Sequence, residues 1–227
     1  MANRNTTGLT RLGILALPLA GLLVLIGNLV GLGIPDPGTD PKGAAQASSS
    51  IGFFLIQVFS NVLGDTLAIF GLFALFAYLV NTRAGRLATL GMVLSVSGLG
   101  LFLSFQGVFT YAIPALAREY LNGHQDALRL TGAFFSAKVF AIVILAGLLQ
   151  FLGLALFGVA IWRSGTLSRW SGVLLGVAGV SLALPVNIPF LNALGALLLV
   201  IATGWIALSV LRRPSTPVGT EAQPRVQ

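Results

Sequence analysis

The stretch Val139–Ile161, VFAIVILAGLLQFLGLALFGVAI, holds a single polar side chain, that of Gln150. An α-helix needs about 20 apolar residues to cross the roughly 30 Å hydrocarbon core of a bilayer. The stretch therefore predicts a transmembrane helix. Because lipid offers no hydrogen bonds to an exposed backbone, it also favours an all-α fold for the chain around it.

The composition of the whole chain agrees with this interpretation. Of its 227 residues, 56% are hydrophobic and 8% are charged, and the mean hydropathy is +0.94. Soluble domains usually carry about 25% charged residues, so this chain has too few to cover a water-facing surface. We expect an integral membrane protein whose main partner is the lipid bilayer.

Five further apolar runs predict a polytopic bundle of six transmembrane helices in one domain, residues 12–213. The predicted spans are residues 12–34, 51–80, 87–113, 139–161, 171–185 and 189–211. The fifth span is short, and the two prolines Pro185 and Pro189 predict a tight turn between it and the sixth.

The connections between the spans set the orientation, because cytoplasmic loops of membrane proteins carry an excess of Lys and Arg. One set of connections, which includes both termini, holds nine basic residues, and the other set holds four. The nine are Arg4, Arg11, Arg83, Arg86, Arg163, Arg169, Arg212, Arg213 and Arg225, and the four are Lys42, Arg118, Arg129 and Lys138. We therefore expect a cytoplasmic N-terminus (1–11) and a cytoplasmic C-terminus.

The parts outside the spans are also predicted. The tail, residues 214–227, contains three prolines and is expected to be disordered. Residues 114–138 form the largest extracytoplasmic loop. Apolar and charged residues alternate in it, which predicts one or two short helices lying at the membrane surface.

The segment Ala155–Gly179, ALFGVAIWRSGTLSRWSGVLLGVAG, joins the fourth and fifth spans. Together with the acidic residue in the second span, it resembles bacterial six-span integral membrane proteins of unknown function. The resemblance covers about residues 10 to 213 and implies a multi-pass protein of the bacterial cytoplasmic (inner) membrane. It implies no functional residue.

Several functions are disfavoured by the residues that the chain lacks. It contains no cysteine and one histidine, His124, so thiolate and multi-histidine metal sites are excluded. The spans contain one aspartate and no histidine, which excludes the known intramembrane serine and aspartyl protease arrangements. The arginines are dispersed between apolar runs, so the net charge of +7 does not indicate a nucleic-acid partner. We expect no enzyme and no cofactor.

Polar side chains within the spans are the candidate functional residues. Counting about 1.5 Å per residue from the basic turns puts Asp65 about 22 Å up its span and Gln150 about 16 Å up. The other amides lie at or above the level of Asp65, so the polar groups gather in the outer half. The candidate site consists of Asp65, Asn61, Gln57, Asn28, Gln106, Asn192 and Gln150.

The second span carries the centre of this set. Gln57, Asn61 and Asp65 are spaced four apart, which stacks them on one helix face. No Lys or Arg lies at the level of Asp65, so we expect an uncharged carboxyl that is hydrogen-bonded to Asn61 or to water. An alternative is that the span breaks at Gly64 and that Asp65 caps the half-helix beginning at Thr66.

Two functions remain open. In the first, the outer half is an outward-facing polar cavity with Asp65 at its floor, which binds or transports a small solute, a cation or a proton. In the second, the protein is an accessory or structural membrane protein, and its polar residues hydrogen-bond neighbouring helices together. Small-residue pairs, Gly27 with Gly31 and Gly172 with Gly176, allow close helix contact within the bundle or in a homo-oligomer.

Overall fold

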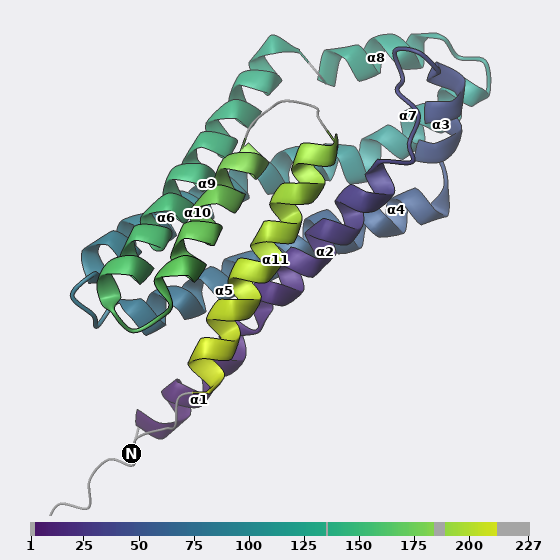
Figure 1. The fold of residues 1–227 in the computed structure, drawn as a ribbon. Helices are drawn as coiled ribbons and strands as arrows, with labels where there is room; N and C mark the ends of the chain where they lie inside the picture. The colour runs from purple at the N-terminus through teal and green to yellow at the C-terminus, as the bar shows by residue number, and fades with distance from the viewer. Residues whose placement is uncertain (1–2, 135, 184–188, 213–227) are drawn as a thin grey trace, which may run out of the picture.

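The computed structural model describes residues 3–134, 136–183 and 189–212, and the part of the chain that it describes is helical with no strand (Figure 1). The helices in chain order are α1 (Asn3–Ile14), α2 (Ala16–Gly31), α3 (Pro41–Ser48), α4 (Ile51–Gln57), the π-helix η1 (Val58–Leu63), α5 (Gly64–Leu79), α6 (Gly85–Gly107), the π-helix η2 (Val108–Ala112), α7 (Ile113–Leu121), α8 (Asp126–Phe134), α9 (Ala137–Ser164), α10 (Arg169–Ala183) and α11 (Pro189–Leu211). The predicted all-α fold is confirmed.

Within the residues that the structure describes, five helices are long and apolar enough to cross a membrane, which identifies a multi-pass membrane protein. They are Thr10–Gly31, Ile51–Leu79, Gly85–Leu121, Ala137–Ser164 and Phe190–Leu211. The helix at the predicted fifth span, α10, is apolar but shorter. Its 15 residues rise only about 22 Å at 1.5 Å per residue, less than the roughly 30 Å of hydrocarbon.

The helices differ from two of the predicted span boundaries. The first span was expected over 12–34, but α2 ends at Gly31, and helix α1 occupies most of the expected N-terminal segment. The third span was expected to end at residue 113, but the helix continues through η2 and α7 to Leu121. Pro114 does not stop it, because Pro114 lies in the first turn of α7, where its missing N–H is tolerated.

The connections contain more helix than expected. Helix α3, in the first loop, was not predicted. Asp40 caps it, since its Oδ1 accepts a hydrogen bond from the Gly43 N–H at 2.8 Å. Helices α7 and α8 agree with the short helices expected between residues 114 and 138. The turn at Pro185 and the tail 214–227 lie outside the described residues.

The second span is one helix, and its two α-helical segments are joined by the π-helix η1. The alternative of a broken span with Asp65 as a cap is therefore wrong. Gly64 has helical backbone angles, φ −58° and ψ −51°, and Asp65 lies inside the first turn of α5. A second π-helix, η2, interrupts the third span, and the rings of Phe54 and Tyr111 join the two spans at 6.0 Å between centroids.

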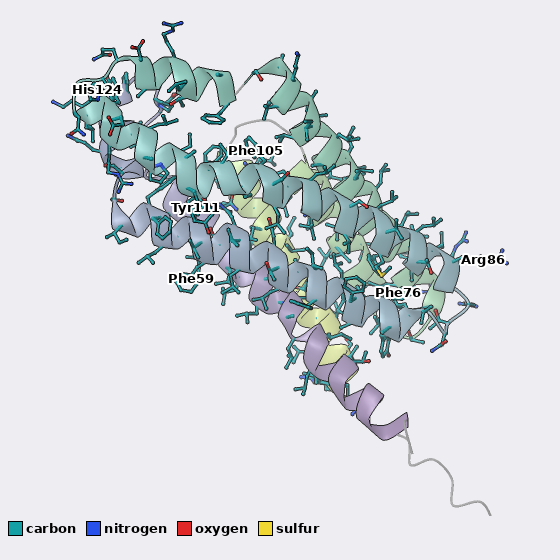
Figure 2. All side chains as sticks on the ribbon, turned by 180° about the vertical axis from the view of Figure 1, so that it is seen from behind. Phe59, Phe76, Arg86, Phe105, Tyr111 and His124 are labelled. Carbon is teal, nitrogen blue, oxygen red and sulfur yellow. The ribbon has the colours of Figure 1, made fainter. Side chains whose placement is uncertain are left out.

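The bundle has two different ends. At one end, here called the basic end, lie the turns 80–84 and 165–168, helix α1 and the C-terminus of α11. At the other, the loop end, lie α3, α7 and α8 (Figure 1). Figure 2 shows Arg86 and His124 at these opposite ends. The described acidic residues outside the spans, Asp36, Asp40, Glu119 and Asp126, are all in connections of the loop end.

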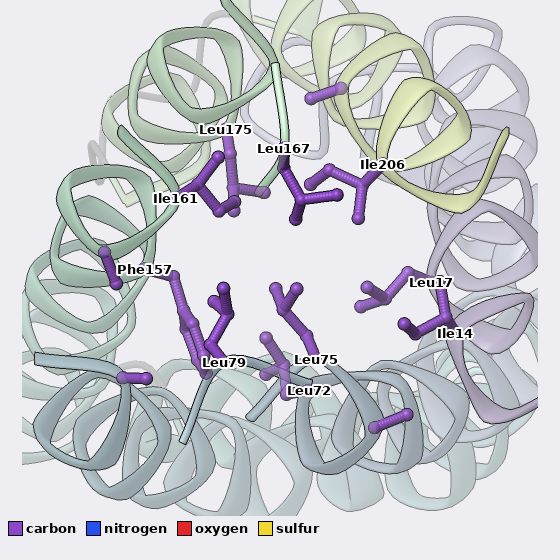
Figure 3. Packing of buried hydrophobic residues seen from close by; sticks show 14 of the residues in the cluster. Ile14, Leu17, Leu72, Leu75, Leu79, Phe157, Ile161, Leu167, Leu175 and Ile206 are labelled. Carbon is purple, nitrogen blue, oxygen red and sulfur yellow. The ribbon is translucent and has the colours of Figure 1, made fainter. Parts of the chain in front are cut away.

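The apolar core is concentrated toward the basic end. Side chains from α2, α5, α9, α10 and α11 converge there, with Leu75, Phe157 and Ile206 fully buried (Figure 3). Four of the predicted amides, Asn28, Gln57, Asn61 and Asn192, lie in the other half of the bundle. Large apolar side chains therefore fill the interior of the bundle at the basic end.

Glycines bring the helices of this core together. A Cβ atom on Gly98 would lie 2.6 Å from the Gln150 backbone N, and one on Gly172 would lie 2.6 Å from the Gly158 backbone O. Helix α9 therefore packs against both α6 and α10 through backbone contact. Of the two predicted small-residue pairs, only Gly27 and Gly172 lie at such contacts. Gly31 and Gly176 have open space where a Cβ would be.

Candidate functional site

A pocket of about 680 Å³ lies at the loop end, between α2, α4, η1 and the start of α11. Residues from the first loop and one aromatic residue of η2 complete its wall. Its lining consists of Gly27, Asn28, Val30, Gly31, Gly33, Ile34, Ala47, Ser50, Gly52, Phe53, Ile56, Gln57, Ser60, Asn61, Phe109 and Asn192. No charged residue lines it. Because its polar groups are mostly side-chain amides, we call it the amide pocket.

The structure brings four of the seven candidate residues together in this pocket. They come from three helices that are distant in the chain: Asn28 from α2, Gln57 and Asn61 from the second span, and Asn192 from α11. Each of these four side chains is partly exposed. The pocket therefore offers several amides to one small volume.

The hydrogen bonds of these amides stay within their own helices. Asn61 Nδ2 donates to Gln57 Oε1, and Asn28 Nδ2 donates to the Val24 backbone O at 2.8 Å. Asn192 makes no side-chain hydrogen bond to any described residue. The Asn28 Oδ1, the Gln57 amino group and the whole Asn192 amide thus have hydrogen-bonding capacity left for another molecule.

A close helix contact forms the inner limit of the amide pocket. Ser60 is 4% exposed, and its Oγ donates to the Ile56 backbone O at 2.6 Å. A Cβ atom on Gly27 would overlap the side chain of Ser60, so α2 and η1 meet at van der Waals distance here. The contact between Gly27 and Ser60 separates the pocket from the part of the bundle nearer the basic end.

Asp65 lies on the basic-end side of this contact and does not line the pocket. The side chain is 9% exposed, and its Oδ2 is fully buried without a hydrogen-bond partner among the described residues. Just before it, Gly64 packs against α2, where a Cβ would lie 3.5 Å from the Val24 side chain. The expected hydrogen bond to Asn61 is not made, because the Asn61 amino group points to Gln57. The pocket floor is thus Ser60, not Asp65.

The other two candidates also lie away from the pocket. Gln106 is near the end of α6 and partly buried, but it is not in the lining. Gln150 lies on α9 at the contact with Gly98 of α6, where the helices are too close for an open site. The structure therefore separates the seven candidates into four pocket residues, one buried acid and two residues outside both.

Three residues of the lining that bear on its chemistry were not predicted: Ser50, Ser60 and Phe109. A signal for Ser60 was present, since it lies three residues after Gln57 and shares its helix face. Phe109 belongs to η2 and packs against Phe105, with 5.3 Å between ring centroids. Its position depends on the π-helix, which the apolar sequence around it does not indicate.

Comparison of the chain with protein-family models, with curated proteins and with solved structures found no match. The site is therefore interpreted from its own geometry.

Proposed function

We propose that this membrane protein binds a small, uncharged, hydrogen-bonding solute in the amide pocket, and that the solute enters from the loop end. The observation that carries the proposal is the meeting of Asn28, Gln57, Asn61 and Asn192 around one volume of about 680 Å³. Amides both donate and accept hydrogen bonds, so they suit a neutral polar molecule. A cation or a proton at Asp65 was the other expectation, and the absence of charge in the lining favours the neutral solute.

The second candidate function is that of an accessory or structural protein in which the amides join the helices. Such a role needs hydrogen bonds between helices. The described hydrogen bonds of Asn28, Gln57 and Asn61 all stay within one helix, which favours the solute site. A homo-oligomer remains compatible with either function.

We also propose six membrane crossings with both termini in the cytoplasm, in a bacterial cytoplasmic membrane as the family resemblance implies. Helix α10 is short, but it packs between α9 and α11, runs antiparallel to both, and leads from the basic end toward the loop end (Figure 1). Helices α1 and α11 contact each other at the basic end. An even number of crossings would place the two termini on the same side of the membrane, as this contact requires. The excess of arginine at the basic end favours the cytoplasm as that side.

Water access to the pocket is the first prediction, and the absence of cysteine from the chain makes it testable with single-cysteine variants. In protein reconstituted into vesicles, Asn61→Cys should react with a charged, membrane-impermeant methanethiosulfonate added on the loop side. Asp65→Cys should react at least about tenfold more slowly, because it lies below the Gly27 and Ser60 contact. The rate of thiol modification is the measurement.

Two further variants control this experiment. His124→Cys, in an exposed turn of the loop end, sets the rate of an open site. Gly100→Cys, on the exposed face of α6 toward lipid, sets the rate of a site without water. If Asn61→Cys reacts no faster than Gly100→Cys, the pocket is closed to water and the proposed function is wrong. Equal rates of thiol modification for Asn61→Cys and Asp65→Cys would instead show that Asp65 belongs to the water-accessible site.

Orientation is the second prediction. In intact cells, an impermeant maleimide should label His124→Cys but not Arg86→Cys, and permeabilising the cells should make both react. The reason is that the two residues lie at opposite ends of the bundle (Figure 2). A tag at either terminus should become accessible to an antibody only on permeabilisation. Labelling of a terminus and of His124→Cys from the same side would contradict the six-crossing topology.

A further inference from the structure

Helices α9 and α10 form an apolar groove on the outside of the bundle that shares no lining residue with the amide pocket. Its volume is about 470 Å³, and Gly158 and Gly172 form its base where the two backbones touch. Gly176 also lines it and has no atom within 4 Å of where its Cβ would be, which leaves the groove open. From Phe151 to Arg163 the groove extends about 18 Å along α9 at 1.5 Å per residue.

The groove ends in positive charge. Arg163 is part of its lining at the basic end, and so is Trp162, whose ring lies 5.6 Å below the Arg169 guanidinium carbon. Arg83 joins them, because its Nε donates to the Arg163 backbone O and one of its terminal nitrogens approaches Gly165. Three guanidinium groups thus surround the place where the groove meets the membrane surface.

The charge of these arginines is not balanced nearby by any residue that the structure describes. Apart from Asp65, the acidic residues at described positions are in connections of the loop end, at the opposite side of the bilayer. Arg163 and Arg169 are exposed. An apolar groove of this length beneath exposed cationic groups matches the shape and charge of an anionic phospholipid, with its acyl chain in the groove and its headgroup on the arginines.

We propose that the α9–α10 groove is a binding site for an anionic phospholipid of the leaflet at the basic end. A second copy of the chain fits the groove less well. Two copies related by an axis along the membrane normal would bring their own arginines together, with no described acidic residue to pair with them. A lipid phosphate instead supplies the missing negative charge.

The test is native mass spectrometry of the full-length protein in detergent, with phosphatidylglycerol and phosphatidylcholine added in equal amounts. The wild type should retain phosphatidylglycerol in preference by at least about 25-fold. A basic residue near an anionic headgroup contributes about fivefold to binding, so Arg163→Gln with Arg169→Gln should lower the preference by about 25-fold. Arg212→Gln, at the same end but directly after α11, should leave the preference unchanged within about twofold.

A second pair of variants tests the apolar part of the site. Gly176→Leu places a side chain in the open groove and should lower retention of both lipids by at least about fivefold. Gly100→Leu, which also enters open space but on α6, should not. Equal retention of the two lipids by the wild type would overturn the proposal, as would equal lipid retention by the two leucine variants. A dimer that Gly176→Leu abolishes would show that a second copy occupies the groove.

Discussion

Replacing Gly153 with alanine should destabilise the bundle more than any other single methyl group added at the glycines compared below. A Cβ at this position would overlap both the side chain and the backbone N of Ser95, and it would lie 2.8 Å from the Gly91 backbone O. Backbone atoms cannot rotate away as a side-chain end can, so α6 and α9 must separate. Overpacking of this kind costs about 1 to 3 kcal/mol. Thermal unfolding of the purified protein in detergent, followed by scanning fluorimetry, measures the loss.

Gly100→Ala and Gly176→Ala are the matched controls for this prediction. Both positions are helical and have nothing within 4 Å of an added Cβ. Alanine has the higher helix propensity, by up to about 1 kcal/mol, so these variants should be as stable as the wild type or slightly more stable. If Gly153→Ala unfolds at the same temperature as the two controls, the close α6–α9 packing does not hold the bundle together.

The lengths of the apolar runs predicted the spans well because the hydrocarbon thickness fixes how much helix must be apolar. The second, fourth and sixth spans agree with the helices 51–79, 137–164 and 189–211 within a few residues. The third helix, Gly85–Leu121, runs past residue 113, where the predicted span ends. Beyond Pro114 the sequence becomes polar, but a helix leaving the bilayer can continue in water, and composition alone does not show where it ends.

The candidate site was predicted in part, for a physical reason that can be seen at Asp65. Depth along a helix follows from counting residues, and four of the predicted amides do lie together in the pocket at the loop end. Whether two residues at similar depth share a cavity depends on which helices touch. Gly27 meets Ser60 above Asp65, and Gly98 meets Gln150 far from the pocket. Both contacts are long-range, and nothing in the local sequence indicates them.

The two halves of the bundle differ in their packing and in the regularity of their helices. At the basic end, large apolar side chains and glycine contacts fill the interior, with Phe157 and Leu75 fully buried. At the loop end, π-helices interrupt two neighbouring spans, and such turns are frequent at functional sites. The π-helix η1 contributes Ser60 and Asn61 to the amide pocket. A well-filled apolar interior at the basic end thus accompanies an irregular helix backbone around the pocket.

Replacing Asp65 with leucine should make the protein more stable. The two terminal methyl groups of leucine branch from the same position as the two carboxyl oxygens, so the change keeps the shape of the side chain approximately. The buried Oδ2 has no hydrogen-bond partner in the described part of the chain. Burying a polar group without a partner costs about 1 to 3 kcal/mol, and leucine removes that cost. The measurement is the midpoint of thermal unfolding in the same detergent.

Thr110→Val is the control for Asp65→Leu, because Thr110 is fully buried, its Oγ1 also lacks a described partner, and valine has the same shape. It should raise stability by a smaller amount, about 1 kcal/mol. If Thr110→Val stabilises the protein while Asp65→Leu destabilises it, the carboxyl has a stabilising partner and the placement of Asp65 in a dry contact is wrong. If both variants are stabilised, the chain keeps a buried acid that its fold does not need. Stability sacrificed at one position is typical of a residue retained for function.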